Sequence, residues 1–354
     1  MEVWTRHLML FLGTFASLWV VVVLLVWSAN PYGNLPGSPL AHVLMDDNQR
    51  FQYPAVIRSH RYDSLVVGTS TSRLLEPKAL EGIFAGRFAN LALNSGTAWE
   101  QWQIALLFQH EVSHPRTLVV ALDHVWCAVD AHVKRITHRG FPEWLFDDNP
   151  WNDLLYMLNA RTVEISGRRI GHALGLMRER WPHDGYEIFV PRDTTYDAAR
   201  AREHIYGSQR PQAAIMAISD SVPPEMMARA EATSKRPDEF PAHAWLESLL
   251  AAKRFQRVVL FIAPVHIVAQ PRTPPEQERE LACKVSLAAI AARHGQRVVD
   301  FRIPSSITRE DSHYWDPLHI RVPIAARVVE ALDRALKTDA SDPNGDWRIL
   351  RVNP

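Results

Sequence analysis

The residues best suited to chemistry are a serine near the start of the chain and an Asp–His pair near its end. Ser70 follows the apolar residues 65–67 and a Gly68-Thr69 step, whereas Asp316 and His319 lie three positions apart. A serine hydroxyl needs a histidine to accept its proton, and that histidine needs a carboxylate to hold its tautomer. These residue types predict acyl transfer through a serine nucleophile.

A second interpretation of the serine remains open. Hydroxyl residues are favoured at the N-terminus of a helix, so residues 69–72 could simply cap a helix that follows the first apolar run. For Ser70 alone the capping interpretation is favoured. Together with Asp316 and His319, the pattern favours a catalytic site.

The elements that must position these residues alternate along the chain. Five short apolar runs predict strands at residues 64–67, 88–93, 117–122, 258–262 and 298–301, and helices are predicted at 98–111, 241–255, 275–294 and from about 322 to 336. Apolar strands separated by helices are typical of a parallel sheet with both faces covered. Ligands bind at the carboxyl ends of such strands. Ser70, Gly96, Asp123 and His266 each follow a predicted strand, so we expect them at one edge of the sheet.

The motifs resemble the SGNH, or GDSL-like, hydrolase superfamily. They are Gly68-Thr69-Ser70, Asn94-Ser95-Gly96 and the terminal Asp316-Pro317-Leu318-His319. The likeness is to the membrane-anchored proteins that act beside membrane-bound O-acyltransferases in envelope polymer acylation. It covers about residues 60–125 and 255–335.

The resemblance implies a flavodoxin-like, three-layer α/β/α domain with a five-stranded, mostly parallel sheet. It implies Ser70 as nucleophile, His319 as base and Asp316 as its orienting carboxylate. The backbone N–H groups of Ser70 and Gly96 would be oxyanion donors.

The chain departs from the family pattern at two positions. Thr69 replaces the usual Asp before the serine, and the third block reads Asp123-His124 where the family has Asn-Asp. A carboxylate cannot donate a hydrogen bond to an oxyanion unless it is protonated. Asn94, Asp123, Arg73 and His266 are therefore further candidates for oxyanion, substrate or supporting contacts. Arg73 could bind a substrate carboxylate or support the hydrogen bonds near Ser70.

The N-terminal sequence predicts a membrane anchor. Residues 8–27 carry no charge, and a helix of this length spans about 30 Å, enough for the hydrocarbon core of a bilayer. A cleaved signal peptide is the competing interpretation, but Trp27-Ser28-Ala29 fits its small-residue cleavage site poorly. Arg6 precedes the span and residues 28–49 contain no Lys or Arg, so the positive-inside rule places the N-terminus in the cytoplasm. With the resemblance, this predicts a single-pass protein of the bacterial cytoplasmic membrane whose C-terminal domain is periplasmic or otherwise extracytoplasmic.

The remaining sequence suggests five parts. We expect a stub and anchor at 1–29, a linker at 30–58, the SGNH-like domain at 59–123 and 236–337, a capping insertion at 124–235, and a polar tail at 338–354. Thirty-nine basic residues balance 39 acidic ones, which gives no field favouring nucleic acid. No His, Cys and carboxylate spacing forms a convincing metal motif, so neither a metal nor another cofactor is expected. Cys127 and Cys283 could form a disulfide, but two buried free thiols are the favoured interpretation.

Two functions are compatible with these features. The first is an esterase or O-acyltransferase that acts on an envelope glycan through a serine acyl-enzyme. The second is a catalytically degenerate accessory protein that binds glycan or a multi-span membrane O-acyltransferase. Ser70, Asp316 and His319 favour the enzyme, whereas Asp123 favours the accessory protein.

Overall fold

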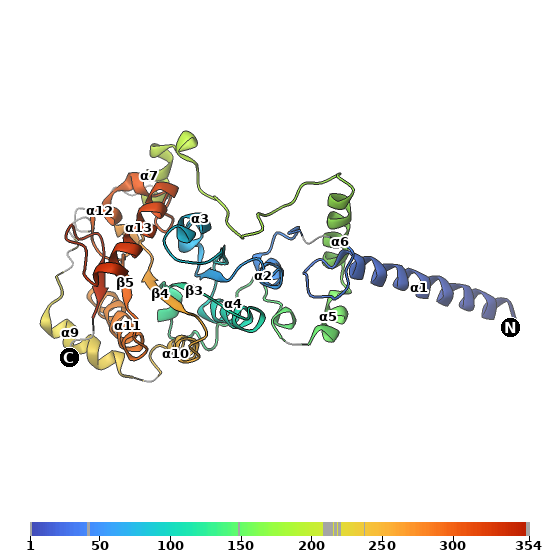
Figure 1. Ribbon diagram of the computed structural model, residues 1–354, viewed down its shortest axis with the longest axis horizontal. Coiled ribbons are helices and arrows are strands. Elements are labelled where there is room, and N and C mark those ends of the chain that lie inside the picture. Colours follow the sequence, from blue (N-terminus) through green and yellow to red (C-terminus); the bar gives the residue numbers. More distant parts are fainter. Residues whose placement is uncertain are drawn as a thin grey trace. The chain divides into compact units, whose positions relative to one another are not determined.

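The computed structural model of the chain describes residues 2–40, 43–147, 149–207, 215, 218, 221–236 and 238–351. The chain divides into two compact units (Figure 1). Unit 1 combines Met1–Ser59 with Phe141–His183, and unit 2 combines His60–Gly140 with Asp184–Pro354. The expected insertion at 124–235 is thus divided between the units, and its residues 148, 208–214, 216–217 and 219–220 lie outside the described part.

Unit 2 is built on a mostly parallel sheet in the order β2-β1-β3-β4-β5-β6. Neighbouring strands from β2 to β5 pair in parallel, and β6 pairs antiparallel with β5. The strands are β1 (Ser64–Val67), β2 (Phe88–Asn90), β3 (Thr117–Ala121), β4 (Arg257–Ile262), β5 (Val298–Asp300) and β6 (Arg348–Leu350). All five predicted strands are confirmed, and their apolar runs are almost wholly buried because the sheet forms the centre of unit 2.

The sixth strand corrects the prediction of five. Residues 338–354 were expected as a polar tail, yet Arg348–Leu350 pairs with β5, and Trp347 and Ile349 are buried. A strand of three residues is too short to show a pattern that could be recognised from the sequence.

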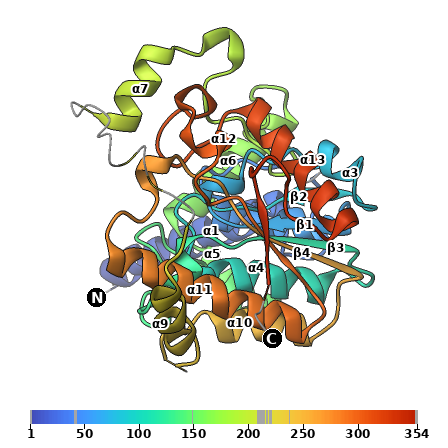
Figure 2. The same cartoon turned by 90° about the vertical axis from the view of Figure 1, so that its left-hand side faces the viewer.

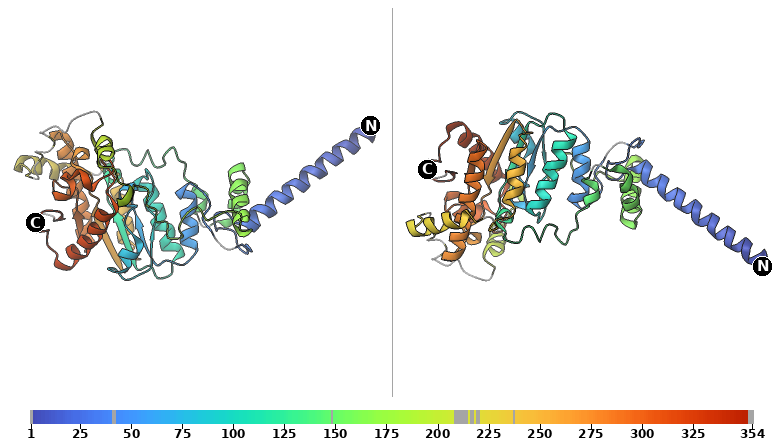
Figure 3. Two further views of the ribbon diagram at one scale, coloured as in Figure 1. Left: turned by 90° about the horizontal axis from the view of Figure 1, so that it is seen from above. Right: turned by 90° about the horizontal axis from the view of Figure 1, so that it is seen from below.

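Helices connect and accompany the strands. In unit 2, α10 contacts both α4 and α11, and α13 contacts α3 (Figures 2 and 3). These helices are α3 (Pro77–Glu81), α4 (Ala98–Glu111), α10 (His243–Ala251), α11 (Pro274–Arg293) and α13 (Val322–Thr338); the unit also contains α7 (Ala198–Tyr206), α9 (Pro224–Ser234) and α12 (Ser306–Arg309). Capping boxes begin α4 at Thr97 and α11 at Thr273, each with a Glu three positions on.

Unit 1 contains α1 (Glu2–Ala29), α2 (Gln49–Arg58), α5 (Pro150–Met157) and α6 (Ala160–Ala173). The region expected as a linker therefore holds a helix, α2, most of whose residues are buried. Helix α1 packs against α6, and at its C-terminal end Val26 and Ala29 are fully buried. Most of the large apolar side chains between Val3 and Leu24 are exposed. By its length and composition, α1 is long and apolar enough to cross a membrane.

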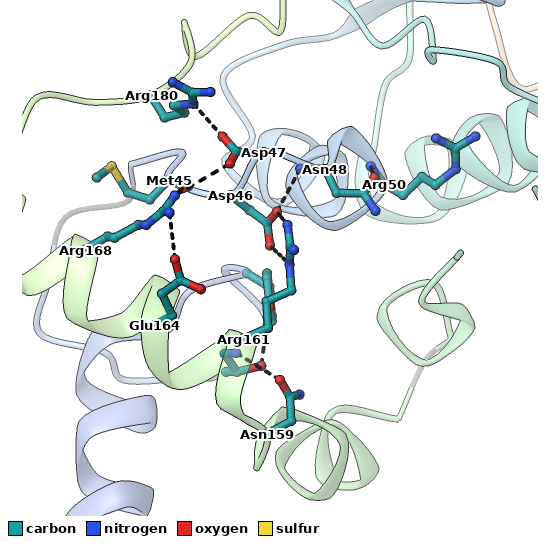
Figure 4. A network of polar contacts seen from close by, with 12 residues as sticks. Met45, Asp46, Asp47, Asn48, Arg50, Asn159, Arg161, Glu164, Arg168 and Arg180 are labelled. Carbon is teal, nitrogen blue, oxygen red and sulfur yellow. Dashed lines mark hydrogen bonds and ion pairs between the residues drawn. The ribbon is translucent and has the colours of Figure 1, made fainter. Parts of the chain in front are cut away.

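Ion pairs tie the segment before α2 to residues on and after α6 (Figure 4). The carboxylate of Asp46 is fully buried and accepts hydrogen bonds from the Arg161 guanidinium, with Nε 3.1 Å from Oδ2. Asp47 accepts from Arg180 at 2.5 Å. Several arginines of the 161–180 stretch thus form structural ion pairs. The pair with Arg161 offsets the cost of burying the Asp46 carboxylate.

A disulfide links Cys127 and Cys283, whose Cα atoms are 5.7 Å apart. The prediction of two free thiols is therefore wrong. Cys127 lies in the turn after β3 and Cys283 lies in α11, and the sequence gives no indication that the fold brings the two within bonding distance.

Candidate active site

The turn after β1 presents Ser70. Strand β1 ends at Val67, and Ser70 opens a short 3₁₀ turn, Ser70–Ser72. Gly68 is needed between them, because a Cβ at this position would lie 2.2 Å from Ser72 Oγ and 2.8 Å from Ala121 Cβ. The absence of a side chain thus lets the turn that carries Ser70 pass close to the end of β3.

A small hairpin after β5 presents the other two residues. Tyr314 bridges to Ile320, and the Trp315 N–H donates to the His319 carbonyl at 3.0 Å. At the tip, Asp316 Oδ1 accepts from the backbone N–H groups of Leu318 and His319 at 2.9 and 3.1 Å. The local backbone therefore fixes the Asp316 carboxylate beside the His319 ring.

The three side chains form a continuous chain of hydrogen bonds. His319 Nδ1 is 2.6 Å from Asp316 Oδ2, and His319 Nε2 is 2.8 Å from Ser70 Oγ. A carboxylate can only accept, so it assigns the proton to Nδ1 and leaves the lone pair of Nε2 to accept the serine O–H. This is the arrangement in which a histidine can remove a proton from a serine.

The Asp316 carboxyl is held in its charged form. Burial raises its pKa, but the hydrogen bond and charge of His319, with the N–H groups of Leu318 and His319, outweigh that effect and lower the pKa below its ordinary value. Asp316 therefore stays a carboxylate at neutral pH, as an orienting group must.

Asp123 supports the turn that carries Ser70. Its side chain is buried and Oδ2 accepts a hydrogen bond from Thr69 Oγ1, while Thr71 Oγ1 lies at 3.4 Å from the same oxygen. Its Oδ1 lies 3.4 Å from the Val125 N–H. The Asp at this position is thus an acceptor for the two threonines beside Ser70. Thr69 and Asp123, the two departures from the family pattern, are hydrogen-bond partners.

Gly96 and Asn94 lie in the loop after β2. The Gly96 N–H points to the Leu93 carbonyl at a long 3.4 Å, and a Cβ on Gly96 would lie 2.8 Å from Leu93 Cβ. Asn94 Oδ1 accepts from Arg73 Nη1 at 2.7 Å. Gly96 lines the same pocket as Ser70, while Asn94 is engaged by the arginine.

Arg73 has a supporting position. Its side chain is 3% exposed, forms an ion pair with Glu187, and stacks its guanidinium over Phe189 at 4.6 Å. Phe189 in turn contacts the His319 ring edge-on, with centroids 5.1 Å apart. Of the two roles considered for Arg73, the structure favours support of the site over direct binding of a substrate carboxylate, because its charge is already paired.

His266 does not join this group. Its ring is fully buried, Nε2 lies 3.1 Å from Asp311 Oδ1, and Nδ1 accepts from the Val268 N–H. Of the two roles considered for His266, its burial favours a supporting contact over direct contact with a substrate. His266 instead donates its backbone N–H to the Pro317 carbonyl at 2.9 Å and so holds the tip of the hairpin.

A pocket of about 930 Å³ opens beside Ser70. Its walls come from the ends of several strands, as expected for a parallel sheet. They include Ser70, Gly96, His124, Val265, Arg302 and Leu318. Among the described residues, no group of three His, Cys, Asp or Glu side chains is placed to hold a metal ion.

Three supporting residues were missed from the sequence. Asn90 is buried at the end of β2, and its Nδ2 lies within 3.2 Å of the carbonyls of Ser72, Arg73 and Leu75, which fixes the chain after Ser70. A lone Asn in an apolar run was a usable signal. Glu187 and Phe189 lie in a segment without recognisable periodicity, so nothing in the sequence pointed to them.

Comparison of the sequence with models of known protein families gave no match, and comparison with curated proteins gave none.

Proposed function

We propose that this chain is a membrane-tethered serine esterase or O-acyltransferase of the SGNH type. The observation that carries the proposal is the Ser70–His319–Asp316 chain, with contacts of 2.8 and 2.6 Å. Its members come from elements far apart in the sequence, and Ser70 also faces a pocket large enough for a sugar-sized ligand. A turn that merely capped a helix would require neither feature.

The reaction would proceed in two halves. Ser70 Oγ attacks the carbonyl carbon of an ester while His319 Nε2 takes the serine proton. As the tetrahedral intermediate collapses, the ester C–O bond breaks and the leaving alcohol receives that proton. Water, or the hydroxyl of an acceptor, then loses its proton to His319 as its oxygen attacks the acyl carbon. The bond from that carbon to Ser70 Oγ breaks, and His319 returns the proton to Ser70 Oγ. Asp316 stabilises the imidazolium in both halves.

We assign the oxyanion contacts to the backbone N–H groups of Ser70 and Gly96. Gly96 shares the pocket with Ser70, and the hydrogen bond from its N–H to Leu93 is long, so this donor is weakly committed. Asp123 is unsuited to the role because its oxygens already accept from Thr69 and its neighbours.

The setting we propose is the outer side of a bacterial cytoplasmic membrane, with α1 as a single-pass anchor and an envelope glycan as substrate. The uncharged residues 8–27 of α1 and Arg6 on their N-terminal side support this orientation, and the Cys127–Cys283 disulfide is typical of an oxidising compartment. We further propose that the two helix groups of unit 2 cover opposite faces of the sheet in three layers. A multi-span O-acyltransferase is the partner that acyl transfer would require.

A catalytically inactive accessory protein is the second candidate. Asp123 favours it, because the side-chain amide that the family offers at this position is replaced by a carboxylate. Such a protein would keep the pocket and bind glycan without forming an acyl-enzyme.

Labelling with a fluorophosphonate separates the two. The purified full-length protein in detergent should be labelled covalently at Ser70, Ser70→Ala should abolish the label, and Ser72→Ala should retain it. Ser72 is the matched control because its Oγ is buried and donates to the Thr69 carbonyl at 3.1 Å. Absence of label in the folded wild-type protein would favour the accessory function.

A further inference from the structure

Arg302 carries an uncompensated buried charge in the pocket that contains Ser70. The residue follows β5, is 8% exposed, and lines the 930 Å³ pocket. Its Nε is buried without a hydrogen-bond partner, and no carboxylate among the described residues pairs with its guanidinium. Buried polar groups are nearly always satisfied, and a buried cation without a partner is costly. Such a group calls for an explanation beyond packing.

The acidic residues around Arg302 are engaged elsewhere. Asp300 and Glu280 both pair with the Lys284 ammonium, at 3.0 and 3.1 Å. Lys284 also donates to the Arg302 backbone carbonyl at 2.7 Å, so the neighbouring charges hold the main chain of Arg302 and not its side chain.

The one other acidic residue of the pocket wall is also engaged. Glu276 accepts from the backbone N–H groups of Arg272 and Thr273 at the start of α11. The described part of the pocket thus offers a guanidinium whose carboxylate neighbours are already satisfied.

We propose that Arg302 binds an oxyanion of the substrate, and that the ester or acceptor handled at Ser70 is therefore a sugar bearing a carboxylate or a phosphate. This inference rests on the proposed function and adds the substrate class. A guanidinium presents a planar fork of N–H donors that matches both oxyanions, whereas a neutral sugar hydroxyl would leave the buried charge uncompensated.

Matched pairs of acetylated oligosaccharides test the proposal. Acetate release is measured with acetylated trigalacturonate and with the same compound after methylation of its carboxyls, and in a second arm with acetylated maltotriose with and without a 6-phosphate. The wild-type protein should turn over one charged member about 10- to 100-fold more efficiently in kcat/KM than its neutral partner, the range of a charge-assisted hydrogen bond. The arm that shows the preference identifies the oxyanion.

Variants then assign the preference to one side chain. Arg302→Met should abolish it, Arg302→Lys should restore part of it, and Arg297→Met should leave it unchanged. Arg297 is the matched control because it precedes β5, where Arg302 follows it, and pairs on the surface with Asp339 at 2.5 Å. Equal turnover of charged and neutral members by the wild type, or a preference that survives in Arg302→Met, would overturn the proposal. The wild-type comparison decides even if the Met variant does not fold.

A binding measurement keeps this proposal distinct from the proposed function. Calorimetry with unacetylated trigalacturonate, with maltotriose 6-phosphate and with their neutral counterparts is carried out on Ser70→Ala, which cannot form an acyl-enzyme. If the charged oligosaccharide binds in an Arg302-dependent way but the wild-type protein is not labelled by the fluorophosphonate, the oxyanion site is supported and catalysis is refuted. Fluorophosphonate labelling without charge-dependent binding would do the reverse.

Discussion

Replacing Asp316 by Asn should separate orientation of the base from stability of the hairpin. The asparagine keeps an Oδ1 that can accept from the Leu318 and His319 N–H groups, which now lie at 2.9 and 3.1 Å from the carboxylate. Its NH₂, however, faces His319 Nδ1, which at present donates across 2.6 Å. The ring must then accept at Nδ1 and carry its proton on Nε2, where it can no longer take the proton of Ser70. Loss of the correct tautomer in serine enzymes lowers turnover about 10⁴-fold, equivalent to about 5.5 kcal/mol of barrier.

The assay is hydrolysis of 4-nitrophenyl acetate by detergent-solubilised full-length protein, with melting temperature measured on the same preparations. We expect a severe loss of kcat with a change in unfolding free energy of about 1 kcal/mol or less, because both backbone contacts survive.

Asp311→Asn is the matched control for this experiment. Asp311 also pairs with a histidine, His266 at 3.1 Å, but that pair does not reach Ser70. Its replacement should lower stability while turnover per folded molecule is retained. Normal turnover in Asp316→Asn together with lost stability would refute the catalytic role and leave Asp316 as a structural cap.

Two further changes test the turn that carries Ser70, and a third tests a buried histidine of α10. Gly68→Ala should lower stability by about 1–3 kcal/mol and reduce turnover, because its Cβ would lie 2.2 Å from Ser72 Oγ; thermal denaturation that shows no change would contradict the close approach. Asp123→Asn should lower the melting temperature and leave turnover no higher, whereas a rise in turnover would show that position 123 serves as an oxyanion donor. Burial lowers the pKa of His243 to about 4, so between pH 6.5 and 4 the unfolded chain binds a proton that the folded chain does not, and stability falls as the pH drops. The loss of stability from this group should reach about 3 kcal/mol in urea unfolding followed across that range. It should disappear in His243→Gln.

The sheet could be predicted from sequence because its strands carry a strong local signal. Each of the first five is a buried apolar run, and the ends of those runs place Ser70 and Asp123 at the carboxyl edge. The helices predicted at 98–111 and 275–294 begin within one residue of α4 and α11, because a helix start is marked by residues close together in the sequence. Contacts between residues far apart in the sequence could not be predicted. The Cys127–Cys283 disulfide depends on how the chain returns to itself, which composition does not specify.

Two Asp–His pairs, Asp311–His266 and Asp316–His319, show what the sequence does not predict. His266 and His319 both belong to loops at the carboxyl edge, and each has an aspartate partner at hydrogen-bond distance. Position along a strand fixes only the edge at which a residue lies. The direction of its side chain depends on the packing around it.

That packing differs sharply between the two rings. The His266 ring lies between Tyr206 and Tyr314, with centroids 5.7 and 5.2 Å away, and is closed off from the pocket. The His319 ring meets Phe189 on one side and Ser70 on the other, and it keeps 18% of its side chain exposed. The buried His266 holds the hairpin through Pro317, and the partly exposed His319 meets the serine. A carboxylate–histidine pair therefore becomes a candidate catalytic group only where a nucleophile and an open pocket adjoin it, and among the residues described in these loops that condition is met at His319.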